Sequence, residues 1–302
     1  MVIVEVRDLL KAYSTKIALK DISFDLEKGS CLAVLGPNGA GKTTLVEILE
    51  GYKKPDSGVV TVMGKAPRDF KTSDLAKVGI LLQETAIEPF LKVKEVIAQR
   101  QRFLKESMPL SEVLDLVGLK DAANQYVSKL SGGQKRKLDF ALAIMGYPEI
   151  VFLDEPTVGF DPEARKQTWA IIESLKKDKR TIILTTHYLQ EAEALADKIL
   201  ILSGGKEVVF KDKKDLNSEI KTSYIIEFVL PTNSFLNVLN RFNFKINDAV
   251  VKLEVEDPTE LLYELAKFSK QNGSKIKGLK VIPIGLEEIY FRLLEENDGK
   301  IN

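Results

Sequence analysis

A short glycine-rich segment, Gly36-Pro37-Asn38-Gly39-Ala40-Gly41-Lys42-Thr43-Thr44, has the residue types and spacing of a phosphate-binding loop. It matches the pattern G-x-x-x-x-G-K-[ST], with an apolar run before it and a helical pattern from Thr43 to Glu50 after it. Glycines let backbone N–H groups curl around a phosphate, and a helix N-terminus adds donors and a favourable dipole. Lys42 then supplies charge for the β- and γ-phosphates, and the Thr43 hydroxyl is placed for Mg²⁺.

Two adjacent carboxylates, Asp154 and Glu155, follow the apolar run Ile150–Leu153. A buried strand of a parallel sheet delivers such side chains to the carboxyl edge, where ligands bind in α/β folds. We expect Asp154 to hold Mg²⁺, directly or through water, and Glu155 to polarise the attacking water as a general base. Alone, the pair is as typical of a solvated strand end. Beside a phosphate loop it indicates nucleotide hydrolysis.

A second anion-binding segment, Leu130-Ser131-Gly132-Gly133-Gln134, precedes a long helix that starts near Lys135. A serine hydroxyl, two glycine amides and a helix N-terminus together favour an anion. One nucleotide has only one γ-phosphate to bind, so a second cradle predicts a second subunit.

These motifs and their order resemble the ATP-binding subunits of ABC transporters, in which LSGGQ is the signature motif. The resemblance covers about residues 1–215. It implies an α/β P-loop NTPase fold, with a RecA-like parallel-sheet core, an antiparallel β subdomain and a helical subdomain. It also implies that ATP and Mg²⁺ are the cofactors and that the chain hydrolyses ATP.

The resemblance further assigns roles by position. Tyr13 matches the aromatic residue that stacks on adenine, and Gln83 matches the glutamine that contacts Mg²⁺ and the water and senses the membrane partner. Asp161 matches the aspartate that crosses the dimer interface, and His187 the switch histidine at the γ-phosphate. The expected catalytic residues are Glu155, His187, Gln83 and Lys42. The expected nucleotide-binding residues are Tyr13, Gly36, Pro37, Asn38, Gly39, Ala40, Gly41, Lys42, Thr43, Thr44, Ser131, Gly132, Gly133, Gln134 and Asp161. The expected metal-binding residues are Thr43, Gln83 and Asp154.

The implied mechanism is a head-to-tail homodimer in which ATP lies between residues 36–44 of one copy and 131–134 of the other. ATP binding closes the dimer and hydrolysis opens it, which drives an integral-membrane permease. Val158-Gly159-Phe160-Asp161 and Thr186-His187-Tyr188-Leu189 resemble the ABC-2-type and drug-resistance exporters. Phe90-Leu91 lies where that family contacts its permease, so it is either a docking contact or a buried anchor.

Two domains are expected. In residues 1–215, near-continuous apolar runs alternate with helical stretches, which predicts a parallel sheet buried on both faces. The runs are Cys31–Leu35, Ile150–Leu153, Thr181–Leu184 and Ile199–Leu202, and the helices are Glu163–Lys177 and Leu189–Asp197. Period-two alternation at Val2, Val4 and Val6, and at Ile22, Phe24 and Leu26, predicts an antiparallel sheet beside the main one. Trp169 falls on an apolar helix stripe and is expected in the core.

Residues 220–302 are expected to form a ferredoxin-like accessory domain of the α+β class. Its β-α-β-β-α-β order consists of the strand Tyr224–Leu230, a helix Asn233–Arg241, a hairpin Phe242–Ile246 and Val250–Val255 turning at Asn247-Asp248, a helix from Pro258 to Lys270, and the strand Lys280–Ile284. A terminal helix, Leu286–Glu296, carries an apolar stripe that must pack on something. The role of this domain stays open.

Composition supports a folded protein that has no net charge. The chain has 302 residues, 44% of them hydrophobic, with 44 basic and 44 acidic side chains. It therefore has no overall field for nucleic acid, and no nucleic-acid partner is expected. One cysteine and one histidine exclude a disulfide framework and a zinc site with several such ligands. We expect a cytoplasmic protein at the inner face of the cell membrane.

Two alternatives remain open from the residues. One is a soluble ABC ATPase, of the cluster-assembly or regulatory type, with no membrane partner. The other is an ATP-binding module that does not hydrolyse, against which the presence of Glu155 and His187 argues. The transported molecule, the direction of transport and the choice of ATP over GTP are not encoded in these motifs.

Overall fold

The computed structural model describes residues 1–14, 16–81, 87–219, 223–230 and 235–298. The chain divides into two compact units, residues 1–213 and 214–302. We describe each unit by itself.

The core of the first unit is a set of parallel strands in which almost every side chain is buried. They are β3 (Cys31–Leu35), β5 (Val78–Leu81), β6 (Ile150–Asp154), β7 (Thr181–Thr185) and β8 (Lys198–Ser203). Their spatial order is β8-β3-β7-β6-β5, with β3 in parallel register with both β7 and β8. Continuous apolar runs suit strands covered on both faces. The four strands predicted from such runs are confirmed, and β5 is one that the sequence reading missed.

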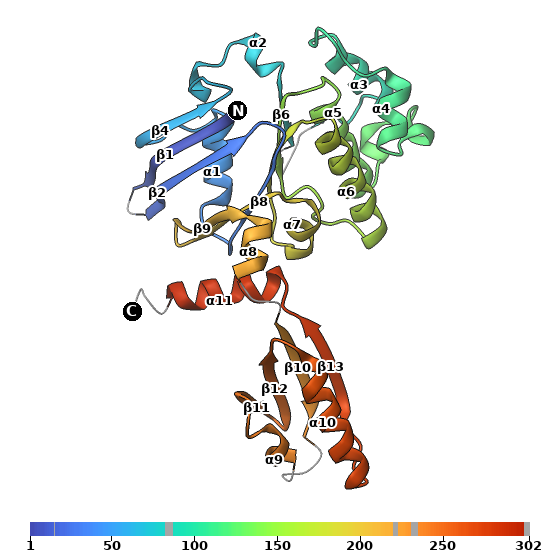
Figure 1. Ribbon diagram of the computed structural model, residues 1–302. Helices are drawn as coiled ribbons and strands as arrows, with labels where there is room; N and C mark the ends of the chain where they lie inside the picture. The colour runs from blue at the N-terminus through green and yellow to red at the C-terminus, as the bar shows by residue number, and fades with distance from the viewer. Residues whose placement is uncertain (15, 82–86, 220–222, 231–234, 299–302) are drawn as a thin grey trace. The chain divides into compact units, whose positions relative to one another are not determined.

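Antiparallel strands extend this sheet at one end (Figure 1). They are β1 (Val2–Tyr13), β2 (Lys16–Glu27), β4 (Ser57–Val62) and β9 (Lys206–Asp212). Val4, Val6, Phe24 and Leu26 are buried, as period-two alternation predicts. The predicted antiparallel pairing is confirmed for β1 with β2 and β4. These strands do not form a sheet of their own beside the main one, because one pairing, Lys20 with Lys206, joins β2 to β9 and makes a single nine-stranded sheet.

Helices surround the parallel strands and also form a cluster of their own (Figure 1). Residues from α3, α4 and α5 pack around Ile97, Leu114 and Leu138 in an apolar core separate from the one beneath the sheet. The helices and 3-10 turns of this unit are α1 (Lys42–Leu49), η1 (Pro67–Asp69), α2 (Thr72–Leu75), α3 (Val93–Gln101), α4 (Leu110–Leu116), η2 (Lys120–Ala122), η3 (Val127–Lys129), α5 (Gly132–Ile144), α6 (Pro162–Lys177), α7 (Leu189–Leu195) and α8 (Lys213–Glu219), which crosses the unit boundary.

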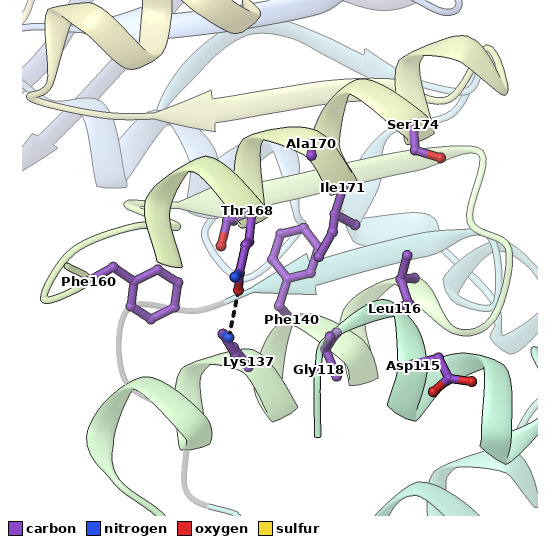
Figure 2. A pocket seen from close by; sticks show the side chains of 12 residues that line it. Asp115, Leu116, Gly118, Lys137, Phe140, Phe160, Thr168, Ala170, Ile171 and Ser174 are labelled. Atoms are coloured by element: carbon purple, nitrogen blue, oxygen red, sulfur yellow. Dashed lines mark hydrogen bonds between the residues drawn. The ribbon is translucent and has the colours of Figure 1, made fainter. Parts of the chain in front are cut away.

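A pocket of about 450 Å³ lies between α4, α5 and α6. Figure 2 shows Phe140 and Lys137 of α5 facing Ile171 and Thr168 of α6, with Phe160 at the end of the row. Lys137 Nζ donates to Gln167 Oε1 at 3.0 Å across this gap. The pocket therefore lies beside the loop that leads into α6 and not at the glycine-rich loop.

The second unit has a four-stranded antiparallel sheet, and the helices of residues 236–239 and 258–271 pack against one of its faces. Its elements are β10 (Tyr224–Val229), α9 (Leu236–Leu239), β11 (Phe244–Asn247), β12 (Val250–Val255), α10 (Pro258–Gln271), β13 (Lys277–Pro283) and α11 (Leu286–Asp298). The strand order is β11-β12-β10-β13. Phe228 and Leu253 of the sheet pack with Leu261 of α10 in one apolar cluster. Asp257 caps α10 and Pro258 occupies its first turn, so the predicted start of this helix is confirmed.

Several predicted boundaries in this unit are wrong. The hairpin turns at Asp248-Ala249, not Asn247-Asp248, because both of these residues have positive φ (48° and 68°) and Asn247 still pairs with Val250. The helix predicted over 233–241 is confined to α9 among the described residues, and Asn233 lies outside them. On the predicted stripe of α11, Leu286 and Ile289 are buried, and Arg292 pairs with Glu254 of β12 at 2.8 Å.

Among the residues that the structure describes, no helix has both the length and the apolar character needed to cross a bilayer.

Candidate active site

The glycine-rich loop connects β3 to α1 and is closely packed against neighbouring backbone. Gly41 has φ +105°, and a Cβ there would lie 2.5 Å from the Ala18 carbonyl oxygen. A Cβ at Gly36 would lie 2.3 Å from the Leu202 carbonyl oxygen. A side chain at either position would therefore displace β2 or β8. The sequence pattern requires glycine at both places for this reason. Most of the loop stays accessible, because Pro37, Asn38, Gly39 and Thr43 are exposed and Gly41 and Thr44 are half-buried, whereas Gly36, Ala40 and Lys42 are buried.

Lys42 lies beneath this loop as a buried cation. Its Nζ donates to the carbonyl oxygens of Gly36 at 2.8 Å and Pro37 at 3.1 Å. Burial lowers the pKa of Lys42, while the carboxylates of Glu155 and Asp154 act in the opposite direction. Among the described residues the hydrogen bonds of Lys42 Nζ go to carbonyl oxygens, so its charge is available to a ligand at the loop.

Asp154 and Glu155 lie at the carboxyl end of β6, as predicted. Asp154 is buried and accepts a hydrogen bond from the Thr185 hydroxyl of β7. Burial raises the pKa of Asp154, and the Thr185 bond opposes that rise. Glu155 has a left-handed backbone with φ 46°, a conformation that costs energy in a residue other than glycine. Its N–H donates to the Thr185 hydroxyl at 3.1 Å, which holds that conformation in place.

His187 follows β7 and meets Glu155 across the strand ends. Its Nδ1 lies 3.2 Å from Glu155 Oε1. The glutamate side chain is 16% exposed and the histidine side chain 44%. The parallel strands β3, β6 and β7 thus bring together Lys42, Asp154, Glu155 and His187, which lie far apart in the sequence.

The signature segment forms the N-terminus of α5. Ser131 Oγ accepts from the Gln134 N–H at 3.2 Å, and Gln134 Oε1 accepts from the Ser131 N–H at 3.0 Å. This reciprocal arrangement is a capping box. Gly132 is exposed, and a Cβ there would meet nothing within 4 Å. A Cβ at Gly133 would lie 3.9 Å from the Phe160 ring.

The remaining predicted residues are placed as follows. Asp161 caps α6, with its Oδ1 accepting from the Ala164 N–H at 2.8 Å. Tyr13 ends β1 with its side chain 40% exposed, and the ammonium groups of Lys53 and Lys11 lie 5.1 and 5.5 Å from its ring centre. Gln83 lies outside the described residues, so its predicted contact with Mg²⁺ stays a prediction.

Three residues at the site were missed by the sequence reading. Arg136 of α5 donates to the carbonyl oxygens of Asp154 at 2.7 Å and Glu155 at 3.1 Å, which ties the signature helix to the carboxylates. Lys16 Nζ lies 3.7 Å from the Cβ position of Gly39, beside the phosphate loop. Glu191 of α7 is fully buried and accepts from Trp169 Nε1 at 3.0 Å. Trp169 is half-buried, so the expectation that it lies in the core is wrong. The only sequence signal for these three residues was that each carries a basic or an acidic side chain.

Glu50, at the end of α1, is a buried carboxyl whose charge the fold does not accommodate. Burial, and then the negative charges of Asp154 and Glu47, raise its pKa from 4.5 to about 8, and its Oε1 has no hydrogen-bond partner within the described chain. Between these two pKa values the unfolded carboxyl is ionised while the folded one keeps its proton. Stability is therefore lost as pH rises through this range.

We expect Glu50→Gln to raise the free energy of unfolding more at pH 8 than at pH 5, by on the order of 1.4 kcal/mol per pH unit. Urea unfolding at both pH values measures this, and an equal gain at both would contradict it.

Comparison with known proteins is consistent with this geometry. Residues 19–158 match the model of the ABC transporter family. The chain is 32% identical over 304 residues to the Nod factor export ATP-binding protein I of Rhizobium etli, covering 97% of this chain and 93% of that protein. It is 34% identical over 253 residues to the linearmycin resistance ATP-binding protein of Bacillus subtilis, covering 82% and 81%.

Solved structures share the fold. The structure of an ATP-binding subunit of an ABC transporter has a TM-score of 0.66 at 24% identity, over 72% of this chain and 92% of that one. A dimeric ATP-binding cassette in a post-hydrolysis state with ADP and Pi has a TM-score of 0.62 at 24% identity, over 69% and 98%. Fold and site together define a P-loop nucleoside triphosphatase. The chain belongs to the ABC transporter family, as an ATP-binding subunit that hydrolyses ATP. The resemblance predicted from the motifs is thus confirmed.

Proposed function

We propose that this chain is the ATP-hydrolysing subunit of an exporter whose membrane-spanning permease is a separate protein. The observation that carries the proposal is the extent of the match to an export ATP-binding protein, 97% of this chain and 93% of the relative. The match therefore includes the C-terminal unit as well as the ATPase unit. Export is favoured over the soluble ATPase alternative for the same reason.

Within the site, each role follows from the position of the side chain. Lys42 and the loop 36–44 bind the phosphates of ATP, and the exposed ring of Tyr13 stacks on the base. Glu155 accepts a proton from the attacking water, since its carboxylate lies at the strand end and contacts His187 at 3.2 Å. His187 binds the γ-phosphate. The role of Gln83 between this site and the permease rests on the family resemblance alone, since Gln83 lies outside the described residues.

The donor set of the site fits Mg²⁺. Asp154 offers a buried carboxylate and Thr43 an exposed hydroxyl, and oxygen ligands of this kind are the ones that Mg²⁺ prefers. Burial raises the pKa of Asp154 although the charges of Arg136 and Lys42 act in the opposite direction, and a bound cation would further favour the ionised carboxylate. Bound Mg²⁺ would neutralise charge on the β- and γ-phosphates.

Two copies bind head to tail in this proposal. The exposed N-terminus of α5, with Ser131–Gln134, faces the γ-phosphate bound by the partner's loop, and Asp161 approaches the interface. Binding of ATP closes the dimer. Hydrolysis detaches the γ-phosphate, and the charge that holds the two copies together leaves with it as inorganic phosphate. Charge that accumulates between two such surfaces is stabilised most when water is excluded.

The C-terminal unit is proposed to be a ferredoxin-like accessory domain spanning residues 220–302, after an ATPase domain of residues 1–215. Its antiparallel strand order β11-β12-β10-β13, with α9 and α10 between the strands in sequence, supports this assignment.

A permease contact near Phe90 and a position at the inner face of the membrane complete the proposal. Phe90 is 78% exposed, whereas Leu91 packs against the apolar cluster of α3–α5. Phe90 is therefore the docking candidate, and Leu91 is the anchor.

Affinity purification with Mg-ATP from detergent-solubilised cells of the native host tests this function, using tagged Glu155→Gln protein to retain the ATP-bound state. We expect a polytopic membrane protein in stoichiometric amount. Phe90→Ser should lower its recovery, and Phe103→Ser, a matched control at a side chain that is 74% exposed, should not. Recovery of the homodimer with soluble partners alone would favour the soluble ATPase.

A further inference from the structure

A buried carboxylate outside the predicted site connects two segments that carry catalytic residues. Glu191 of α7 has 0% of its surface exposed. Its Oε1 accepts from the Thr157 hydroxyl at 2.9 Å and from Trp169 Nε1 at 3.0 Å. Thr157 lies two residues after Glu155, and Trp169 belongs to α6. Three elements therefore share one acceptor atom, and a buried polar group of this kind is costly to leave unpaired.

The same helix is attached directly to His187. Tyr188, the residue before α7, accepts the Glu191 N–H through its carbonyl oxygen at 3.0 Å. Its ring centre lies 4.2 Å from that of His187, and the Arg165 guanidinium of α6 lies 4.2 Å from the same ring. The backbone from 187 to 191 is thus held by helical hydrogen bonding and by ring contacts.

These contacts form a closed circuit. One segment runs from Glu155 to Thr157 and the other from His187 to Glu191. The Glu155–His187 contact at 3.2 Å joins them at one end, and the Thr157–Glu191 hydrogen bond at 2.9 Å joins them at the other. Removing the second connection frees the segments to shift at the first.

We infer that Glu191 is a positioning residue for ATP hydrolysis, which holds the segment carrying His187 against the segment that follows Glu155. The inference rests on the catalytic roles of Glu155 and His187 under the proposed function. Glu191 acts through its hydrogen bonds, since both donors use Oε1, whereas Oε2 is buried with no partner within the described chain. An amide oxygen replaces that acceptor, so glutamine suffices at this position.

The test compares Glu191→Gln, Glu191→Leu and Thr157→Val in full-length protein. We expect Glu191→Leu to lower kcat between about tenfold and a hundredfold, with KM for ATP changed less than about threefold, because misplaced groups lose rate and the nucleotide contacts stay intact. Glu191→Gln should keep kcat within about threefold of the unmodified chain. Thr157→Val should lower kcat, and the double variant Thr157→Val/Glu191→Leu should be no slower than Glu191→Leu alone.

Trp169 is the only tryptophan of the chain, so its emission reports on this cluster directly. We expect Glu191→Leu to shift the emission maximum and Glu191→Gln to shift it less. The control is the same pair of changes at Glu193, which is exposed on the same helix and should leave kcat and emission unchanged.

Three results would overturn the inference: unchanged kcat in Glu191→Leu, an equal loss in Glu191→Gln, or additive losses in the double variant. If Glu191→Leu does not fold, the other two variants decide: the inference then requires a lowered kcat in Thr157→Val and a retained kcat in Glu191→Gln. His187→Ala and Glu155→Gln are measured in parallel. Full activity in those two variants would reject the proposed catalytic roles. Loss of activity in both of them, together with an active Glu191→Leu, would reject only the positioning role.

Discussion

Glu155→Gln is expected to bind ATP and hydrolyse it about 10²- to 10⁴-fold more slowly, which is the range that a positioned general base contributes. The substitution keeps side-chain size and leaves the backbone bond from the Glu155 N–H to Thr185 in place. It removes the charge that accepts a proton and changes the partner of His187 Nδ1 at 3.2 Å. Because the phosphate loop is untouched, ATP stays bound and the closed dimer accumulates.

Phosphate release and size-exclusion chromatography with Mg-ATP measure the two consequences. The unmodified chain should dimerise only transiently, while Glu155→Gln should elute as a dimer with ATP and as a monomer without it. Glu163→Gln is the matched control, since that carboxylate is exposed on the first turn of α6. Hydrolysis by Glu155→Gln within about threefold of the unmodified rate would exclude Glu155 as the base.

The parts of the site that were predictable from the sequence are those in which chemistry dictates residue type locally. The phosphate loop needs glycine where backbone approaches backbone, as at Gly41 and Gly36, and needs lysine at its helix start. The contact between Glu155 and His187 was not predicted, although both residues follow buried strands and parallel strands end at a common edge. Tertiary contacts between distant segments carry no such local signal. The Arg136 bonds to the ends of β6 and the burial of Glu191 depend on how α5, α6 and α7 pack.

The fold shows the same division between features that local sequence predicts and features that depend on tertiary contacts. Long apolar runs indicated buried strands, and Pro258 marked the start of α10. The turn at Asp248-Ala249 was misplaced by one residue, because alanine is an unusual residue at positive φ and the pairing of Asn247 with Val250 decides the register. The single pairing between Lys20 and Lys206 that unites the sheet has no sequence signature, since it joins a polar residue within β2 to the polar first residue of β9.

Mixing two inactive variants should restore hydrolysis if the sites are shared between copies. Lys42→Met keeps the side-chain stem but removes the charge beneath the phosphate loop. Gly132→Asp places a carboxylate in the signature segment, where an added Cβ meets nothing within 4 Å, so the fold tolerates it. The added negative charge repels the γ-phosphate bound by the other copy. Each homodimer then has two defective sites and is expected to be inactive.

A mixed dimer differs because both defects lie in the same one of its two sites. One site combines both changes, and the other combines the intact loop of the Gly132→Asp copy with the intact signature segment of the Lys42→Met copy. With random pairing and independent sites, an equimolar mixture should recover about a quarter of the unmodified activity, measured as phosphate release after co-refolding or co-expression. Gly132→Ala in place of Gly132→Asp is the control, since it adds volume without charge and should stay active by itself. Sites contained within one chain predict no recovery in the mixture, because each chain then keeps its own defect whatever its partner. Recovery therefore requires that residues 36–44 and 131–134 act on the same nucleotide from two different copies.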